Sequence, residues 1–387
     1  MRIALIDSTP RAKFYPLALL KIGAWRESLG DNCKIFNDRL PKAGKYDEIW
    51  ITTTFTFDIP HALGIVRAAK ERAPRVIVGG ISATLLPDLF KKEGVEVHQG
   101  LLPEAEKFSP DYSLLEEKPK YSIVHTSRGC LRACGFCMVH KLEPVFFHKH
   151  NWEKDINPET DKVLFYDNNW LAKKPKNLKE DIVTLHKLRK EGRIKAIDFN
   201  QGLDARLMTE EIADLLKGLP IFPIRFAFDN MQEDGYYQRA VRMMAKRGFH
   251  GFMTYVLYNY KDTPEDFYYR LKESVLISAD LRIAVDSFPM RYQPILEIDE
   301  KRKYVGRYWT VQKRKVVKAI LGYYSGRAGT VTAHAYNTMP PIEEFEYWFG
   351  KDEKEFNKLL SYPRLRQLFK RKKGALRMAR AKAVKIN

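Results

Sequence analysis

Short apolar runs alternate with helical segments along most of this sequence, and that alternation limits the fold more than any other feature. In the first hundred residues the predicted strands are 2–7, 32–37, 48–54, 75–80 and 95–100, and the predicted helices are 16–29, 60–72 and one from Ser82. Runs that are apolar throughout are typical of parallel strands covered by helices on both faces. The sequence therefore predicts an α/β domain over 1–108 with an open, doubly wound parallel sheet.

A second series of strands and helices follows 109–120, a polar segment with proline that is predicted as a linker. Its predicted strands are 121–127, 162–169, 196–203, 223–230, 251–259 and 281–288, with helices that include 177–191, 209–217, 234–247 and 264–277. Parallel strands joined by crossover helices predict a partial (β/α) barrel over 121–298, with reactive groups at the carboxyl ends of the strands. The remaining residues, 299–387, are predicted as a basic, mainly helical C-terminal region.

Three of the four cysteines lie within eight residues, as Cys130-x3-Cys134-x2-Cys137, directly after the first strand of the second series. Three thiolates can hold three irons of a [4Fe-4S] cluster, whereas a cluster that only carries electrons normally has a fourth cysteine ligand. The fourth iron is then left for a cofactor, and S-adenosylmethionine (SAM) is the cofactor that is cleaved reductively in this way to start radical chemistry. So few cysteines do not form a disulfide framework, so a reducing cytoplasm is expected.

A structural zinc site is the alternative interpretation of the same residues. Thiolates of Cys130, Cys134 and Cys137 with an imidazole of His140 or His125 would suit tetrahedral zinc. Structural zinc usually holds together a small module without another core, whereas five more predicted strands follow these cysteines. On this interpretation the protein is a non-catalytic, zinc-stapled nucleic-acid-binding protein.

The cysteine spacing, its place after a strand and the strands that follow resemble the radical SAM superfamily over residues 121–295. The resemblance implies a [4Fe-4S] cluster, bound SAM, a reductant such as flavodoxin or ferredoxin, and an adenine contact from Phe136, the aromatic residue before the last cysteine. The segments PLALLKIGAWRESLG, VIVGGISATLLPD and PDYSLL resemble the subgroup that carries a cobalamin-binding-type domain before the barrel. A radical SAM enzyme that abstracts hydrogen from a substrate, with RNA as one candidate, is thus implied. Cobalamin-dependent radical methylation of a small molecule or protein is an open alternative.

Polar residues at the predicted strand ends are the candidates for binding SAM and substrate. In the superfamily the end of the second strand binds the methionyl amino group, which here points to the segment FYDNNW. The candidate cofactor-binding residues are Phe136, Asp167, Asn168, Asn169, Gln201, Arg206, Asp229, Tyr258 and Asn259, and the candidate substrate residues are Asp204, Asp286, Arg291 and Gln293. Catalytic residues are not predicted. Local turns formed by Asp and Asn, and a helix cap formed by Asp204 with Arg206, are the structural alternatives.

Cobalamin with a histidine ligand would need the pattern D-x-H-x-x-G after the first strand of the front domain, and the pattern is not there. The nearest match, DIPHALG, follows the third strand, so His61 is predicted as an ordinary helix residue. Gly79, Gly80 and Ser82 form a strand-to-helix turn that would approach the nucleotide tail of a cobalamin. A tight turn that binds no ligand is the equal alternative.

Positive charge concentrates in the C-terminal region. The chain has a net charge of +19, and 301–330 holds nine Lys or Arg and 361–387 holds ten, with no acidic residue in either segment. Aromatic residues interleave with them, namely Tyr304, Tyr308, Trp309, Tyr323 and Tyr324. This pattern predicts a surface that binds RNA phosphates and stacks bases, with a solvated basic tail or an acidic membrane surface as alternatives. Neither a secretory signal nor a transmembrane segment is predicted.

Overall fold

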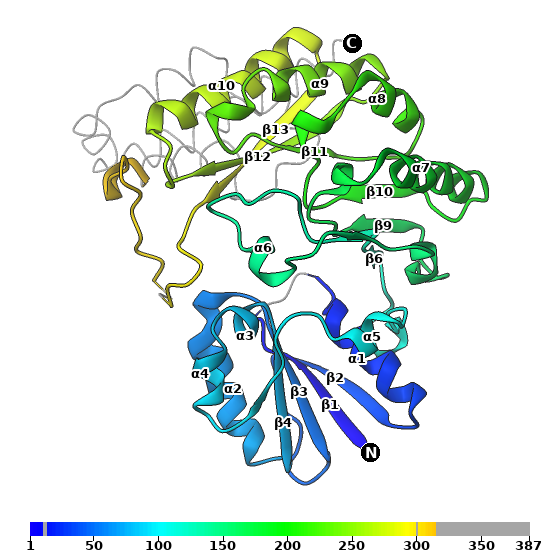
Figure 1. Cartoon of the computed structure of the whole chain (residues 1–387), viewed down its shortest axis with the longest axis vertical. Helices are drawn as coiled ribbons and strands as arrows, with labels where there is room; N and C mark the ends of the chain where they lie inside the picture. Colours follow the sequence, from blue (N-terminus) through cyan, green and yellow to red (C-terminus); the bar gives the residue numbers. More distant parts are fainter. Residues whose placement is uncertain (11–13, 299–300, 315–387) are drawn as a thin grey trace, which may run out of the picture. The chain divides into compact units, whose positions relative to one another are not determined.

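The computed structural model of the chain describes residues 1–10, 14–298 and 301–314 (Figure 1). The chain divides into two compact units. The first comprises the described residues of 1–227, 235–249 and 292–304, and the second comprises those of 228–234, 250–291 and 305–387. Within the described residues, the helices are too short or too polar to cross a membrane.

The first unit begins with a five-stranded parallel sheet in the order β2-β1-β3-β4-β5. Its strands are β1 (Arg2–Asp7), β2 (Asn32–Asn37), β3 (Glu48–Thr53), β4 (Arg75–Gly80) and β5 (Glu96–Val97). Its helices are α1 (Leu17–Ser28), α2 (Ile59–Lys70), α3 (Ile81–Leu85), α4 (Pro87–Lys91) and α5 (Pro103–Glu106). The strand order reverses direction between β1 and β3, and ligands of such sheets bind outside the carboxyl ends of the strands at this switch point.

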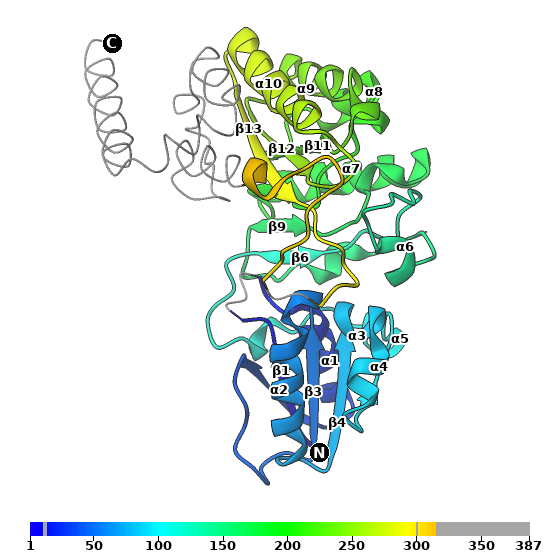
Figure 2. The same ribbon diagram turned by 90° about the vertical axis from the view of Figure 1, so that its left-hand side faces the viewer.

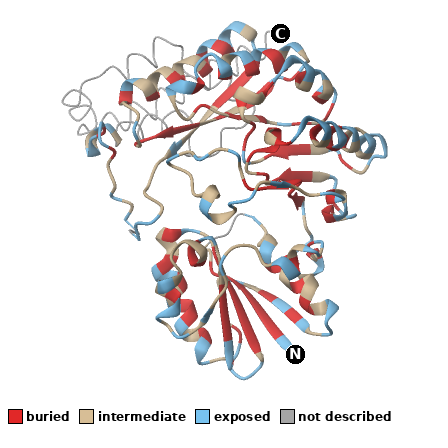
Figure 3. Ribbon diagram, viewed as in Figure 1, coloured by how far each residue is buried: buried red, intermediate tan, exposed pale blue. Residues whose placement is uncertain are grey.

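Two apolar cores cover the two faces of this sheet. Along β1, Ile3 and Leu5 pack in the core that contains residues of α1, whereas Ala4 and Ile6 pack in the core that contains residues of α2. This division follows from the pleat, which points successive side chains to opposite faces. The central strands β1 and β3 are therefore buried along most of their length (Figure 3), and the strands run in the same direction (Figure 2). The predicted doubly wound sheet is confirmed.

Gly80 ends β4 in a conformation that requires glycine. Its φ is +95°, and a Cβ there would lie 2.5 Å from the backbone oxygen of Thr53, whereas a Cβ on Gly79 would meet nothing closer than 3.7 Å. We expect Gly80→Ala to lower the free energy of unfolding by about 2–4 kcal/mol, because left-handed strain and a backbone clash add. Gly79→Ala is the matched control and should change it by less than about 1 kcal/mol. Thermal unfolding of both variants checks this, and equal losses would contradict it.

The second series of strands lies in both units. The first unit contains β6 (Ser122–Val124), β7 (Ser127–Arg128), β8 (Phe147–His148), β9 (Lys162–Phe165), β10 (Ala196–Phe199) and β11 (Ile224–Ala227), and the second contains β12 (Gly251–Tyr258) and β13 (Ala284–Arg291). The first unit has a parallel sheet β10-β9-β6, and Leu203 beyond β10 bridges to Phe226 of β11. In the second unit β12 and β13 pair in parallel over eight residues.

Longer helices connect these strands in the order that the sequence predicts. They are α7 (Pro175–Lys190), α8 (Glu210–Leu216), α9 (Tyr236–Lys246) and α10 (Pro264–Leu281), and the short α6 (Val139–Leu142) follows the cysteines. Parallel strands with helical crossovers confirm the predicted α/β class. The predicted domain limits at 108, 120 and 298 stay a prediction.

Several predicted strands have different limits in the structure, and two of them show a physical reason. The strand predicted over 121–127 breaks after Val124, because Asp167 accepts hydrogen bonds from the backbone N–H of Thr126 and from the hydroxyls of Thr126 and Ser127. The strand predicted over 281–288 begins only at Ala284, because α10 continues to Leu281. In the first case hydrogen bonds to a distant aspartate end the strand. In the second case a longer helix delays the start of the strand.

Most of the predicted RNA-binding region, including Tyr323, Tyr324 and 361–387, lies outside the described residues. Trp309 is described, and its prediction as a surface platform for bases is wrong. Its side chain is 4% exposed and packs on Tyr258 and Phe267, with ring centroids 5.3 and 5.8 Å away. The ring completes an apolar core against α10 and is thus closed to a base.

Candidate metal centre and cofactor site

The three cysteines lie on the loop between β7 and α6, and each is half-buried. The backbone N–H of Arg132 donates to Sγ of Cys130 over 3.4 Å, and that of Val139 donates to Sγ of Cys137 over 3.5 Å. Hydrogen bonds to sulfur are among the contacts that tune cluster-bound thiolates, so this donor set fits an iron–sulfur cluster. Among the described residues, His, Cys, Asp and Glu side chains do not converge in threes on a metal position. Binding a metal therefore requires the thiols to turn toward one another.

Glu143 fixes the start of this loop. Its carboxylate accepts hydrogen bonds from Nη1 of Arg128 at 3.1 Å, from the backbone N–H of Gly129 at 2.7 Å and from Nδ2 of Asn168 at 2.9 Å. Gly129 has a φ of +76°, and a Cβ there would lie 2.6 Å from the backbone oxygen of Val145, so only glycine fits. The chain thus reaches Cys130 along one defined path.

Removing the Glu143 carboxylate is expected to lower the cluster content of the protein. Glu143→Ala removes one acceptor of Arg128 and leaves the N–H of Gly129 without its side-chain acceptor, so we expect less than half of the wild-type iron after anaerobic reconstitution, with Glu143→Gln intermediate. Glu104→Ala, at an exposed glutamate of α5, is the matched control and should load fully. Iron and sulfide analysis measures the result, and full loading of Glu143→Ala would contradict the role of this residue.

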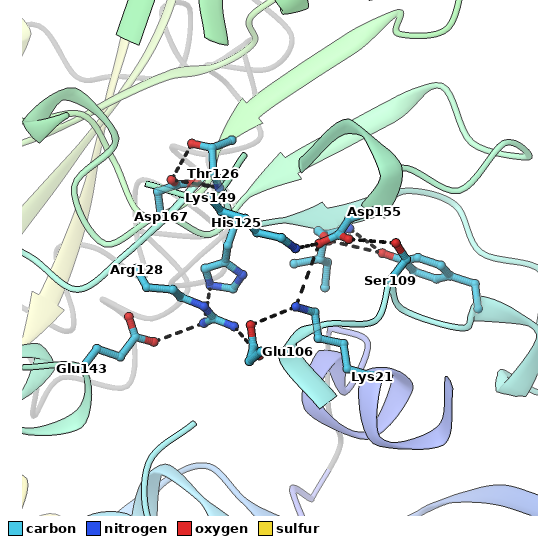
Figure 4. Close-up of polar contacts among 12 residues, drawn as sticks. Lys21, Glu106, Ser109, His125, Thr126, Arg128, Glu143, Lys149, Asp155 and Asp167 are labelled. Atoms are coloured by element: carbon cyan, nitrogen blue, oxygen red, sulfur yellow. Dashed lines mark hydrogen bonds and ion pairs between the residues drawn. The ribbon is translucent and has the colours of Figure 1, made fainter. Parts of the chain in front are cut away.

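Buried ion pairs connect the front sheet and its helices to the cysteine loop (Figure 4). Glu106, at the end of α5, accepts from Nη2 of Arg128 at 2.9 Å and from Nζ of Lys21 at 3.0 Å, and Lys21 on α1 is 1% exposed. Burial alone would raise the pKa of Glu106, but the charges of Arg128 and Lys21 outweigh it and lower the pKa. Arg128 therefore joins a carboxylate of the front region to Glu143 of the loop.

His125 is neutral and turned toward Arg128. Burial first, and then the charge of Arg128, hold the pKa of His125 well below its usual value. Its Nε2 lies 3.0 Å from Nη1 of Arg128, which can only donate, so Nε2 accepts and Nδ1 carries the proton. In this tautomer neither nitrogen offers a free lone pair to zinc. His140 stays the imidazole of the zinc alternative, and its Nδ1 is buried with no hydrogen-bond partner in the described part of the chain.

Asp204, which follows β10, accepts hydrogen bonds from two arginine side chains. Its carboxylate accepts from Nε of Arg206 at 2.7 Å and from Nε of Arg132 at 3.1 Å, and it also caps the backbone N–H of Arg206. Burial would raise the pKa of Asp204, but the two arginines outweigh it and lower the pKa, so the group is ionised. Arg132 lies between Cys130 and Cys134, and this ion pair joins the cysteine loop to the strand end. Arg132 was not among the predicted site residues, although its place inside the cysteine motif was a signal.

The predicted site residues after β9 form hydrogen bonds with other residues of the protein. Asp167 accepts from Thr126 and Ser127, Asn168 donates to Glu143, and Asn169 donates from Nδ2 to Asp204 at 3.2 Å. Oδ1 of Asn169 is buried and has no hydrogen-bond partner among the described residues, so it can accept from a ligand. Gln201 is exposed and Phe136 is half-buried. Their contacts with SAM stay predictions.

In the second unit, three predicted site residues take part in the scaffold. Oδ1 of Asp229 accepts the N–H of Leu257 at 3.0 Å, Tyr258 belongs to the core with Trp309, and Oδ1 of Asn259 accepts the N–H of Gly306 at 2.9 Å. Asp286 is different, because it is 3% exposed and its Oδ1 has no hydrogen-bond partner within the described residues. Arg291, at the end of β13, is half-buried. The side-chain amide of Gln293, in the first unit, is buried and likewise unpartnered among the described residues.

The turn after β4 offers one unpartnered hydroxyl at the carboxyl end of the front sheet. Ser82 is fully buried, and its Oγ has no hydrogen-bond partner among the residues that the structure describes. The helix that contains it, α3, contacts α6, which follows the last cysteine. His61 is exposed on α2, and its Nε2 lies 2.5 Å from Oδ1 of Asp38, as expected of an ordinary helix residue. The turn and the cysteine loop are therefore neighbours.

Solved structures of one enzyme share this fold over most of the chain. The radical SAM methyltransferase TsrM from Kitasatospora setae, with cobalamin and a [4Fe-4S] cluster bound, is 13% identical, with a TM-score of 0.58 over 90% of this chain and 85% of that chain. The same enzyme with its tryptophan substrate and the SAM analogue aza-SAM bound is 13% identical, with a TM-score of 0.56 over 91% of this chain and 84% of that chain. Protein-family models and curated proteins give no match. This chain therefore shares its fold with a radical SAM methyltransferase, as the resemblance in the sequence predicted.

Proposed function

We propose that this protein is a radical SAM enzyme with a [4Fe-4S] cluster on Cys130, Cys134 and Cys137, and that it methylates its substrate with the help of cobalamin. The observation that carries the proposal is the cysteine loop, which Glu143 and Arg128 fix beside the turn at the carboxyl end of the front sheet. TsrM, which is similar in fold, binds a [4Fe-4S] cluster and cobalamin. When bound, the cluster supplies an electron to SAM and the corrin carries a methyl group.

The side chains around Asp204 suit the methionyl end of SAM. Arg132 and Arg206 place two guanidinium groups there, and a guanidinium binds a carboxylate through two parallel hydrogen bonds. Oδ1 of Asn169, which has no partner in the described part of the chain, would accept from the methionyl ammonium. These residues would orient SAM next to the loop that carries Cys130, because Arg132 belongs to that loop.

The carboxyl end of the front sheet suits a corrin without a histidine ligand. Ser82 offers a buried hydroxyl there, and Phe55 and Ile81, which follow β3 and β4, are 47% and 43% exposed. Exposed apolar side chains at a switch point can pack on the apolar face of a large ring. The cofactor would thus lie between the front sheet and the cysteine loop, since α3 and α6 are in contact.

Anaerobic reconstitution of the full chain tests this function. About four irons per chain are expected, together with retention of an added corrin and conversion of SAM to S-adenosylhomocysteine or 5′-deoxyadenosine. Ser82→Ala is the informative variant, because it should weaken corrin retention and leave the iron content unchanged. One tightly bound zinc and no product from SAM would instead support the zinc-stapled nucleic-acid-binding protein.

The reductant and the substrate belong to the same proposal. A cluster that must be reduced before each turnover needs a low-potential donor, such as flavodoxin or ferredoxin, in a reducing compartment such as the cytoplasm. RNA stays a predicted partner, resting on the basic segments 301–330 and 361–387.

A further inference from the structure

Asp286 is a buried carboxyl group in the middle of the last strand. It lies on β13, opposite Met253 of β12 in the parallel ladder, and its side chain is on the same face as that residue. Val256 and Tyr258 of β12 pack on Phe267 and Leu271 of α10, so the alternate residues Met253 and Asp286 point away from that helix. Asp286 is therefore buried on the face of β13 that α10 does not cover, with only 3% of the residue exposed.

Two aromatic rings flank this carboxyl group on its own face. Tyr255 and Phe288 are the next pair on the same face of the ladder after Met253 and Asp286. Their rings meet edge to face with centroids 5.8 Å apart. Asp286 therefore lies at the edge of an aromatic surface. Such a surface favours planar or cationic groups, through stacking and cation–π attraction.

Nothing in the described part of the chain compensates the charge of Asp286. Its Oδ1 is buried without a hydrogen-bond partner, although buried polar atoms are almost always paired. Burial alone raises the pKa of Asp286 to about 7, with no contribution from a charged side chain. The titratable side chain beside it on the same face is the phenol of Tyr255. A buried, unpaired acceptor in a folded protein is a sign of a ligand contact.

We propose that Asp286 recognises the substrate by accepting hydrogen bonds from a nitrogen-bearing planar group, such as an amidine, a guanidine or the ring N–H of a heterocycle. The aromatic pair Tyr255 and Phe288 would pack along the plane of this group while Oδ1 of Asp286 receives its N–H. A substrate of this class supplies an N–H donor for Asp286 and a planar face that packs on the two aromatic rings. The inference rests on the proposed function, because it names the substrate of the same enzyme.

Binding of two matched probes to the full chain tests the inference. Benzamidine carries N–H donors on a planar group, whereas acetophenone has nearly the same shape and only an acceptor. At pH 8 we expect wild-type protein to bind benzamidine at least about tenfold more tightly than acetophenone, measured by calorimetry or ligand-observed NMR. Asp286→Asn should lose this preference, and Asp280→Asn, at an exposed aspartate of α10, should keep it.

Acidity gives a second readout of the same contact. Wild-type affinity for benzamidine should fall about tenfold or more between pH 8 and pH 5.5, because Asp286 takes up a proton in this range. Equal benzamidine binding by wild type and Asp286→Asn, or no binding by wild type, overturns the inference. These binding measurements need no turnover. Probe binding can therefore fail while iron loading and SAM cleavage succeed. Probe binding can equally succeed while iron loading and SAM cleavage fail.

Discussion

Replacing Cys130 with serine is expected to abolish cluster binding. Reconstituted wild-type protein should hold about four irons per chain, and Cys130→Ser should hold less than about one, because two remaining thiolates cannot retain the inorganic core. The same loss is expected for Cys134→Ser and Cys137→Ser, since the three residues share one loop. Iron and sulfide analysis, with the visible charge-transfer absorption of the cluster, measures the effect.

Cys33→Ala is the matched control for this experiment. Cys33 lies on β2 and is 8% exposed, and burial raises the pKa of its thiol to about 12, so it is not a thiolate that binds metal at neutral pH. The control should load as much iron as the wild type. Iron retained by Cys130→Ser, or one zinc that survives in place of iron, would reject the assignment of the cluster to this loop.

Replacing Asp286 with asparagine is expected to stabilise the protein at alkaline pH. The folded pKa of Asp286 is about 7, above its ordinary value of 3.8, so folding favours the protonated form. The stability contributed by this group is therefore complete below about pH 4 and is lost as the pH rises through 7. A difference of about three pKa units corresponds to about 4 kcal/mol of folding stability. The wild type loses this stability when Asp286 ionises at alkaline pH. Asp286→Asn does not lose it, because asparagine has no proton to release.

Thermal unfolding of the two proteins at several pH values checks this prediction. The melting temperature of Asp286→Asn should exceed that of the wild type by several degrees at pH 8, and the two should approach each other near pH 4. Asp280→Asn, exposed on α10, should follow the wild type at every pH. Parallel curves for wild type and Asp286→Asn would show that the carboxyl group is not held in an unfavourable environment.

Local patterns in the sequence were sufficient to predict most helices and strands and to single out the motif of three cysteines. The predicted strands 2–7, 32–37 and 75–80 have the same limits as β1, β2 and β4. Apolar runs mark β1 and β4, which are covered on both faces, whereas the edge strand β2 buries only alternate residues. The spacing of Cys130, Cys134 and Cys137 is likewise local, so the resemblance to the radical SAM superfamily was visible without the fold. The predicted strand 95–100 was too long, since β5 comprises only Glu96 and Val97.

The roles of individual side chains at the strand ends needed the tertiary structure. Asp167, Tyr258 and Asn259 all occupy predicted site positions, yet their side chains contact Thr126, the core around Trp309 and the backbone of Gly306. The polar composition of a strand end does not say which of its groups are already satisfied. Hydrogen-bond partners far away in the sequence decide that.

By itself, the sequence determined the α/β class, the succession of strands and helices and the loop of three thiols, because periodicity and spacing are properties of neighbouring residues. The tertiary structure alone decided the sheet order, the Arg128 contacts with Glu106 and Glu143, and the ion pair of Arg132 with Asp204. It also decided the burial of Asp286, whose Oδ1 has no hydrogen-bond partner among the described residues. These features join residues that are distant along the chain. Packing brings such residues together, and burial then sets which of their charges are paired and which are left for a ligand.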